Sequence, residues 1–433
     1  MPMALKNYFQ KGFWKKLADL FRPIYHYLLA LAGALWYRFP AKNIFVVAVT
    51  GTKGKTTTVE IIGAILKEDG YKVALSSTLH FEIAGAEERN LFKMTMPGRF
   101  FIQKFLRRAV NAKCDYAVIE MTSEGAQQFR HKFTALNALV FTNLAPEHIE
   151  SHGSFENYLA AKLKLARALE KSHKDRKFII ANVDDPQGNT FLNANVPGKF
   201  PFSLKNTSPY LIKKEGLEFA LENRKVISPL SGEFNLYNIL ASIMFARSQN
   251  ITDEIIIKAV EKFSGLRGRV EKVTLSSNDP DSIKQNFSVI VDYAHTPDSL
   301  EKVYQVFQNT RLICVLGNTG GGRDTWKRPI MGQIADRYCD HIILTNEDPY
   351  DEDPRKILQE IHTAIKETAC EEILDRRSAI RRALGLAKTG DTVIITGKGT
   401  DPYIMGPHGQ KTPWDDATVA REELKNTLNA RTA

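Results

Sequence analysis

A short run rich in glycine, lysine and threonine offers the clearest chemistry in the chain, from Gly51 to Thr57. Glycines let backbone N–H groups close around phosphate oxygens, and the N-terminus of a following helix adds a favourable dipole. Lys55 can neutralise the β- and γ-phosphates of a nucleotide, while the Thr56 hydroxyl can bind Mg²⁺. The sequence therefore predicts a phosphate loop formed by Gly51, Thr52, Lys53, Gly54, Lys55, Thr56 and Thr57.

Alternating elements must position this loop. A helical pattern follows it at 57–68, and short apolar runs rich in β-branched residues recur along this part of the chain. These runs lie at 44–49, 116–120, 138–142 and 178–182. Strands alternating with helices are typical of βαβ units and a mainly parallel sheet. Polar and apolar alternation at 204–231 predicts antiparallel strands on the sheet edge, and helices are expected at 235–248 and 253–263.

Loop-forming composition at 265–284 indicates a domain boundary, and a second α/β alternation follows it. Its strands are expected at 287–293, 312–317, 341–345 and 392–396. Ligands of open α/β sheets bind where such strands end. We expect an α/β protein with a short helical N-terminal segment (1–42), a central P-loop ATPase domain (43–269) and a C-terminal Rossmann-like domain (270–433).

Composition fits a folded protein of two or three domains, with 433 residues, 43% hydrophobic and 25% charged. The four cysteines form no CxxC pair, which argues against a zinc ribbon or a disulfide framework and fits a reducing compartment. We interpret them as small buried hydrophobic residues.

The first 42 residues carry seven basic residues against one acidic residue, and they include ten aromatics. No groove-reading motif accompanies this charge, so we expect no nucleic-acid partner. The apolar run at 27–35 is well short of the roughly 20 residues that a spanning helix needs. Its basic start resembles a signal peptide, but a nucleotide loop only a few residues later makes export a poor interpretation. Two alternatives stay open for the segment: a helix packed on the next domain, or contact with a membrane surface.

The phosphate loop resembles that of the Mur ligases and their folylpolyglutamate synthase relatives, and further Mur motifs follow in order. They are Glu120-Met121-Thr122-Ser123, the stretch 147–153 with Lys162 on the next helix, Gly232–Asn238, Asp292–Leu300, Lys327–Gly332 and Gly397-Lys398-Gly399. The wording of the last three is close to the MurE type. The chain is therefore identified as a member of the Mur ligase family, MurE type.

This resemblance implies an ATP- and Mg²⁺-dependent ligase that makes an amide bond through an acyl phosphate, with Lys55, Glu120, His148 and Lys162 as catalytic residues. Thr56, Glu120, His148 and Lys162 would hold the metal, with Lys162 carbamylated so that it can donate oxygen. The resemblance also implies nucleotide contacts from Asn235, Asn238, Asp292 and His295.

The resemblance further implies two substrate-binding sets. Thr95, Met96, Thr122, Gln128 and Arg130 would bind the muramoyl dipeptide, with Met96 in place of a usual threonine. Arg323, Glu347, Asp348, Pro349, Tyr350, Gly397 and Asp401 would bind the incoming amino acid. Enzymes that use meso-diaminopimelate show D-N-P-R where this chain has Asp348-Pro349-Tyr350 after Glu347. An acidic loop without the arginine favours a cationic side chain such as that of L-lysine, which Asp401 could also contact.

We expect a cytoplasmic monomer that serves peptidoglycan and cell-wall biogenesis and thereby cell shape and division, with a peripheral location at the inner membrane face as the alternative. Its substrates would be a UDP-linked muramoyl dipeptide and a free diamino acid. Only about fifty residues precede the phosphate loop, too few for the family's UDP-binding domain. A Mur-like ligase acting on a lipid-linked or non-peptidoglycan acceptor, and a nucleotide-binding regulatory homologue without turnover, therefore remain alternatives.

Overall fold

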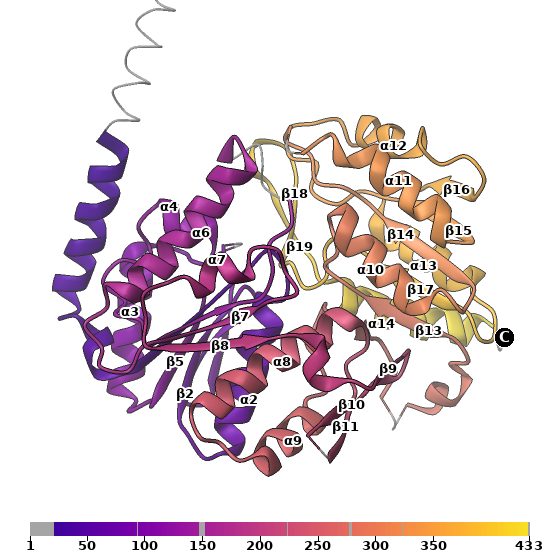
Figure 1. The fold of residues 1–433 in the computed structure, drawn as a ribbon. Helices are drawn as coiled ribbons and strands as arrows, with labels where there is room; N and C mark the ends of the chain where they lie inside the picture. Colours follow the sequence, from indigo (N-terminus) through magenta and orange to yellow (C-terminus); the bar gives the residue numbers. More distant parts are fainter. Residues whose placement is uncertain are drawn as a thin grey trace, which may run out of the picture. The chain divides into compact units, whose positions relative to one another are not determined.

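The computed structural model describes residues 21–92, 94–146, 152–222, 224–276, 279–322 and 324–431. The chain divides into two compact units, each with its own large sheet (Figure 1). Unit 1 comprises Met1–Pro209, Ala220–Arg224 and Asn235–Lys262. Unit 2 comprises Tyr210–Phe219, Lys225–Phe234 and Phe263–Ala433.

The sheet of unit 1 has eight strands in the order β4-β3-β2-β5-β1-β6-β7-β8. Their bounds are β1 Phe45–Thr50, β2 Val73–Ser76, β3 His80–Ile83, β4 Ala86–Arg89, β5 Tyr116–Glu120, β6 Ala138–Phe141, β7 Phe178–Asn182 and β8 Gly198–Phe202. The six strands from β2 to β8 in this order are parallel, while β3 and β4 add an antiparallel hairpin at one edge. The predicted mainly parallel sheet is confirmed. Because the carboxyl ends of parallel strands share one sheet edge, loops after β1, β5 and β6 converge.

Helices cover both faces of this sheet (Figure 1). They are η1 Pro40–Asn43, α2 Lys55–Glu68, α3 Arg99–Asn111, α4 Ser123–Gln127, α6 Phe155–Glu170, α7 Gly188–Leu192, η2 Leu204–Thr207, α8 Glu233–Ser248 and α9 Asp253–Lys262. Side-chain caps fix where some of them begin: the Ser154 hydroxyl accepts the Asn157 N–H at the start of α6. One continuous apolar core packs α3 and α6 on the sheet, with Phe141 stacked on Phe191.

The antiparallel strands expected at 204–231 exist, but their predicted place was wrong. They are β9 Tyr210–Lys213, β10 Gly216–Leu221 and β11 Arg224–Ser228, and they form a separate three-stranded sheet. The edge of the large sheet is instead the β3–β4 hairpin. Each of its strands has only four residues, and β4 is exposed at every position, so no apolar alternation marks it in the sequence.

The main sheet of unit 2 has six strands in the order β12-β13-β17-β14-β15-β16, all parallel except β12. The strands are β12 Glu271–Lys272, β13 Ser288–Val291, β14 Leu312–Leu316, β15 His341–Leu344, β16 Ala369–Glu372 and β17 Thr392–Ile395, with a small hairpin of β18 Tyr403–Met405 and β19 Lys411–Pro413. The helices are η3 Pro280–Lys284, α10 Pro297–Phe307, α11 Lys327–Tyr338, α12 Pro354–His362, α13 Arg376–Leu386, η4 Pro407–Gly409 and α14 Asp416–Ala430. Two apolar clusters, one on each face, enclose the sheet, as the predicted Rossmann-like alternation requires.

Two cysteines of unit 2 depart from the sequence-based interpretation. Cys314 on β14 and Cys339 at the end of α11 form a disulfide, although they lie 25 positions apart. The chain runs from β14 through α11 into the neighbouring β15, and this crossover brings the end of the helix back beside the strand. Cys114 is buried with a free thiol, as expected, and Cys370 is partly buried.

Residues 21–36 are helical, and the two sides of this helix differ. Ala30 and Ala34 are buried, and the Tyr27 ring packs near Phe129 and Phe133. A packed helix, one of the two alternatives for the N-terminal segment, is thus present. Large apolar side chains remain exposed, namely Phe21, Ile24, Tyr25, Leu28, Leu35 and Trp36. Among the described residues, no helix has both the length and the apolar character to cross a bilayer.

Candidate functional site

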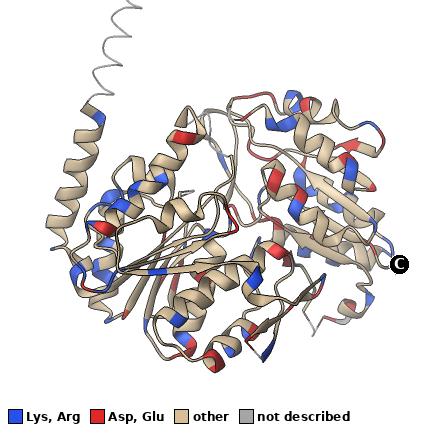
Figure 2. Ribbon diagram, in the orientation of Figure 1, with Lys and Arg blue, Asp and Glu red and all other residues tan. Residues whose placement is uncertain are grey.

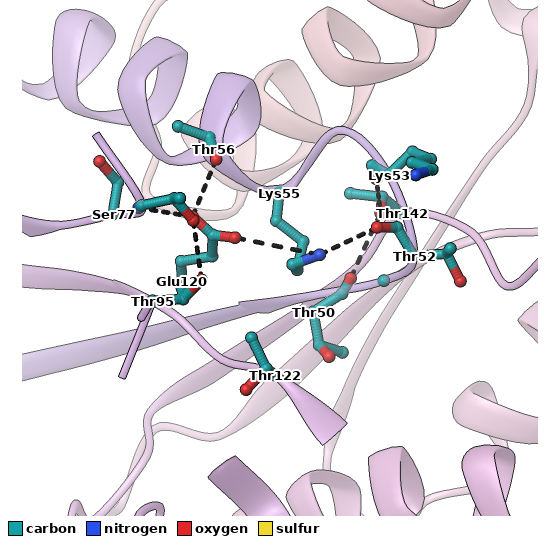
Figure 3. A network of polar contacts seen from close by, with 12 residues as sticks. Thr50, Thr52, Lys53, Lys55, Thr56, Ser77, Thr95, Glu120, Thr122 and Thr142 are labelled. Carbon is teal, nitrogen blue, oxygen red and sulfur yellow. Dashed lines mark hydrogen bonds and ion pairs between the residues drawn. The ribbon is translucent and has the colours of Figure 1, made fainter. Parts of the chain in front are cut away.

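The predicted phosphate loop connects β1 to α2 and is held from several sides (Figure 3). Its Thr52 N–H donates to the Asn143 carbonyl at 2.8 Å, and its Lys53 N–H donates to Asn143 Oδ1 at 2.9 Å. The Thr142 hydroxyl donates back to the Lys53 carbonyl at 2.8 Å. The loop therefore rests on the segment that follows β6, and Thr142 and Asn143 fix its path.

Two glycines of the loop have no room for a side chain. A Cβ on Gly51 would lie 1.9 Å from Thr142 Oγ1, and one on Gly54 would lie 2.0 Å from Asn238 Oδ1. Gly54 also has a φ of +81°, which side-chain-bearing residues rarely adopt. These contacts bring the predicted nucleotide residue Asn238 of α8 next to the loop. Asn238 Nδ2 in turn donates to Asn235 Oδ1 at 3.1 Å.

Glu120, at the end of β5, lies directly under the start of α2 (Figure 3). Its Oε2 accepts the Thr56 hydroxyl at 2.9 Å, and its Oε1 lies 3.9 Å from Lys55 Nζ. Lys55 Nζ also donates to the Thr52 carbonyl at 2.9 Å. Glu120 is 2% exposed, so its carboxylate, the Thr56 hydroxyl and the Lys55 ammonium meet out of bulk water.

Thr78 is a member of this cluster that sequence analysis missed. Both its backbone N–H and its hydroxyl donate to Glu120 Oε2 at 3.0 Å, and its Oγ1 lies 2.8 Å from Thr95 Oγ1. The available signal was its place just after β2, at the same sheet edge as Glu120. Thr78 thereby links the presumed metal-binding carboxylate to Thr95 of the predicted acceptor set.

Lys162 reaches the phosphate loop from α6. Its Nζ donates to the Gly51 carbonyl at 2.6 Å and lies 4.8 Å from the centre of the Tyr158 ring. The side chain is 1% exposed. Tyr158 of the same helix also contacts the loop, with its hydroxyl 3.0 Å from Thr52 Oγ1. Glu147, His148 and Glu150 lie outside the described residues.

The predicted acceptor residues lie in two segments of unit 1. Thr95 and Met96 precede α3, whereas Thr122, Gln128 and Arg130 flank α4. Thr122 serves as the N-cap of α4, and its backbone N–H contacts Met96 Sδ at 3.5 Å. Gln128 Oε1 accepts from Arg130 Nη2 at 2.7 Å and from Arg99 Nη2 at 3.3 Å. Arg99, at the start of α3, was not predicted, and a lone arginine after a proline–glycine pair carries no distinctive signal.

The two guanidiniums form a positively charged pair. Within the described residues, neither Arg99 nor Arg130 forms an ion pair with a carboxylate, and Arg130 Nε has no hydrogen-bond partner. Burial lowers the pKa of both groups, and for Arg130 the neighbouring Arg99 lowers it further. An anion bound here would relieve this repulsion, and the planar guanidinium fork suits a carboxylate.

The remaining predicted residues belong to unit 2. Asp292, at the end of β13, is buried and accepts the N–H groups of Val270 at 2.7 Å and Ala294 at 2.6 Å. Burial raises the pKa of this carboxyl group. His295 Nδ1 lies 2.8 Å from the Tyr293 carbonyl, so one ring nitrogen is oriented by the backbone. Arg323 lies outside the described residues.

A buried charge cluster occupies the strand ends of unit 2. Lys398 Nζ lies 2.8 Å from Asp348 Oδ1 and 2.9 Å from Asp401 Oδ2, and it is 1% exposed. Asp401, which was predicted to contact a substrate ammonium, is paired with Lys398 in this structure. The sequence places Lys398 three residues before Asp401, but it does not show that the Lys398 side chain is buried. The structure shows this in the loop that follows β17.

Glu347 differs from its two acidic neighbours. It is 3% exposed, its Oε1 accepts the Thr319 hydroxyl at 2.7 Å, and its Oε2 has no hydrogen-bond partner. Gly397 faces the same carboxylate, since a Cβ there would lie 2.6 Å from Glu347 Oε2. Tyr350 follows Pro349, has a φ of +52°, and donates its backbone N–H to Met405. Glu347, Gly397 and the Asp348–Lys398–Asp401 triad thus lie together.

The chain is similar in sequence and fold to known amide-bond ligases. Residues 49–246 match the Mur ligase middle domain, and residues 268–399 match the Mur ligase, glutamate ligase domain. The chain is 40% identical over 416 residues to a UDP-N-acetylmuramoyl-L-alanyl-D-glutamate–2,6-diaminopimelate ligase of Syntrophomonas wolfei, covering 92% of this chain and 82% of that protein. A solved ligase of the same name has a TM-score of 0.60 at 28% identity, covering 90% of this chain and 79% of that one. The fold also matches Mycobacterium tuberculosis folylpolyglutamate synthase, with a TM-score of 0.66, 16% identity, and 86% of this chain and 91% of that one covered.

The contact between Gly54 and Asn238 can be tested with a matched pair of glycine substitutions. Gly54→Ala should weaken ATP binding at least about tenfold, because a methyl group there meets Asn238 in addition to the left-handed backbone strain. Gly70→Ala has a similar φ of +88° but meets nothing within 4 Å, so it should cost only about 1 kcal/mol of stability and leave ATP binding intact. Calorimetric ATP titration and urea unfolding of both variants check this. Equal ATP affinity in the two variants would contradict it.

Proposed function

The chain belongs to the Mur ligase family of ATP-dependent amide-bond ligases, and we propose that it joins a diamino acid to a muramoyl-L-alanyl-D-glutamate acceptor during peptidoglycan precursor synthesis. The observation that carries this proposal is the convergence of Lys55, Thr56, Glu120 and Lys162 around one phosphate loop. We propose the division at 43–269 and 270–433 as a functional one. The reaction would take place in the cytoplasm, where ATP is available, with the chain as a monomer.

Amide formation requires activation, since a carboxylate and an amine form only a salt at neutral pH. The acceptor carboxylate would attack the γ-phosphorus of ATP and release ADP, giving an acyl phosphate. The free amine of the diamino acid would then attack the acyl carbon, and the tetrahedral intermediate would expel inorganic phosphate and lose a proton. No side chain of the protein becomes covalently attached in this scheme.

The residues around the loop suit the first step. Lys55, near the phosphate positions, would offset the charge that gathers as two anions approach. Asn238 would hold the loop in its phosphate-binding shape, because its amide lies against Gly54. Asn235, Asp292 and His295 remain proposed nucleotide contacts, as do Gly51, Thr52, Lys53 and Thr57 of the loop.

The donor set fits Mg²⁺. Glu120 and Thr56 present hard oxygen ligands 2.9 Å from each other, and both side chains are buried. Bound here, Mg²⁺ would supply positive charge beside the phosphates. His148 and a carbamylated Lys162 remain the proposed further ligands, and Lys162 Nζ donates to the Gly51 carbonyl of the phosphate loop at 2.6 Å.

The second, non-reacting carboxylate of the acceptor's D-glutamate would bind at the Arg99–Arg130 pair. This pair offers two guanidiniums without a carboxylate partner among the described residues, joined through Gln128. Thr95, Met96 and Thr122 border the same region, and Thr78 connects it to Glu120. An acceptor held by its carboxylate at this pair would point its reacting group towards the phosphate loop.

The amino-acid end would be recognised in unit 2. Lys398 pairs with Asp348 and Asp401, whereas Glu347 Oε2 has no hydrogen-bond partner among the described residues. A substrate ammonium would complete this cluster, whereas a second substrate carboxylate would add repulsion. Tyr350 supplies no cation for that carboxylate, so we propose a preference for L-lysine or L-ornithine over meso-diaminopimelate, with Arg323 binding the α-carboxylate.

Membrane contact is a second proposal, carried by the helix at 21–36. Besides Tyr27, six large apolar side chains are exposed on it, and Trp36 is 76% exposed. Figure 2 shows this helix almost free of charged positions beyond its start, and the sequence before it is basic. An apolar stripe joined to basic residues suits the interface of an anionic membrane. Such a location would bring a lipid-linked acceptor within reach.

A direct assay tests the ligase proposal. Purified full-length protein should release ADP with UDP-N-acetylmuramoyl-L-Ala-D-Glu and L-lysine, and Lys55→Ala should lose at least about a hundredfold in rate. Lys104→Ala, an exposed lysine on α3, should retain full activity. Turnover with a lipid-linked dipeptide alone would reject the UDP-linked acceptor. ATP binding without turnover on any acceptor would favour the regulatory homologue, and turnover on a non-peptidoglycan acid alone would favour that alternative.

Substituting Tyr350 tests the side-chain preference. Tyr350→Arg should raise kcat/KM for meso-diaminopimelate relative to L-lysine about tenfold or more, because the guanidinium supplies a partner for the second carboxylate. Tyr350→Gln removes the ring without adding charge and should not produce this change. Competition assays with both amino acids give the ratio. Wild-type preference for meso-diaminopimelate, or an unchanged ratio in Tyr350→Arg, would contradict the proposal.

Vesicle sedimentation tests the membrane contact. The full chain should bind vesicles containing anionic phospholipid, and Leu28→Glu with Leu35→Glu should weaken that binding at least about tenfold, since both exposed leucines would enter the interface. Leu211→Glu alters an equally exposed leucine on β9 and should have no effect. Binding that survives the double substitution, or no binding by wild type, would reject this contact.

A further inference from the structure

Three metal-ligating side chains meet on the β3–β4 hairpin. His80 and Glu82 alternate along β3 and therefore point to the same face, and Glu87 on β4 lies directly opposite Glu82. One ligand atom from each of the three lies within 4.8 Å of the other two. None of these residues belongs to the nucleotide or substrate sets described above.

Helix α2 adds a fourth group to this cluster from above the sheet face. Glu60 is 6% exposed, and its Oε2 lies 3.5 Å from His80 Nε2. Its Oε1 has no hydrogen-bond partner, and neither has His80 Nε2. A carboxylate that is more than nine-tenths buried is thus aimed at an imidazole nitrogen with an unsatisfied atom beside it.

Three acidic side chains, Glu60, Glu82 and Glu87, gather in this cluster, and Lys67 Nζ lies 2.9 Å from Glu82 Oε2. Burial raises the pKa of Glu60 to about 8, with Ser77 and Lys67 acting in the opposite direction. Burial also lowers the pKa of His80, which keeps the imidazole neutral and its lone pair available near neutral pH.

Like charges directly opposite each other on paired strands destabilise a sheet, so the Glu82–Glu87 pair requires a compensating positive charge. Lys67 compensates Glu82 alone, because its ammonium contacts both oxygens of that side chain. The Lys67 side chain is 45% exposed and can turn to solvent if another cation takes its place. A divalent cation within reach of His80, Glu82 and Glu87 would offset the repulsion between the two opposed glutamates.

We propose that Glu60, His80, Glu82 and Glu87 form a binding site for a divalent transition-metal cation of the Zn²⁺ type. One imidazole nitrogen with carboxylate oxygens is a donor set that suits Zn²⁺, while Mg²⁺ and Ca²⁺ prefer oxygen alone. The site is separate from the Thr56–Glu120 pair. Because Glu60 lies on α2, the bound ion would tie the hairpin to the helix that begins at the phosphate loop.

The test uses the full chain freed of metal with a chelator and kept without nucleotide. Competition against a chromogenic chelator should show one equivalent of bound Zn²⁺, and Co²⁺ should give visible absorption bands typical of nitrogen and oxygen ligands. His80→Asn and Glu87→Gln should each weaken Zn²⁺ binding at least tenfold. Glu87 is exposed, so Glu87→Gln keeps the test valid if His80→Asn folds poorly.

Two further variants separate this site from others. Glu88→Gln changes the adjacent residue, which points to the opposite face and pairs with Arg108, and it should leave Zn²⁺ affinity unchanged. Glu120→Gln removes the carboxylate at the phosphate loop and should also leave it unchanged. Absence of stoichiometric Zn²⁺ binding, equal affinity in Glu87→Gln, or loss of binding in Glu120→Gln would overturn the proposal.

Discussion

The close fit of the phosphate loop against its neighbours is the constraint on which the rest of unit 1 depends. Neither Gly51 nor Gly54 has room for a Cβ, because Thr142 and Asn238 touch the loop from two sides. The loop can hold this path only if β6 and α8 are in place. The parallel sheet provides that arrangement, since it ends β1, β5 and β6 at one edge and carries the loop, Glu120 and Thr142 to the same place.

Buried cations and carboxylates around this loop form a network in which each charge depends on another. Lys55 lies between the Thr52 carbonyl and Glu120, and Lys162 donates to the Gly51 carbonyl from the opposite side. Thr78 donates two further hydrogen bonds to Glu120 Oε2. Such a network is costly to assemble without bound phosphate and metal, which is consistent with a site organised for phosphoryl transfer.

Unit 2 also gathers buried charges at its strand ends, but there the excess is of carboxylates. Its strand ends place Asp348 and Asp401 around Lys398, and Glu347 keeps one oxygen without a hydrogen-bond partner among the described residues. In unit 1, the Arg99–Arg130 pair forms no ion pair with a carboxylate of the described residues. This opposite charge would suit the proposed reaction, in which unit 1 binds an anionic group of the acceptor and unit 2 binds a cationic group of the diamino acid.

The sequence by itself determined the fold class, the phosphate loop and the order of motifs, because glycine, apolar β-branched runs and short catalytic motifs are local signals. Tertiary structure alone decided the partners of those residues. Thr78, Arg99 and Lys398 enter their clusters through contacts across 42, 29 and 50 positions, which no periodicity encodes. The exposed four-residue β4, the separate β9–β11 sheet and the Cys314–Cys339 disulfide likewise depend on how distant segments pack. Local spacing fixes backbone conformation, whereas burial and charge pairing arise only once the chain has folded.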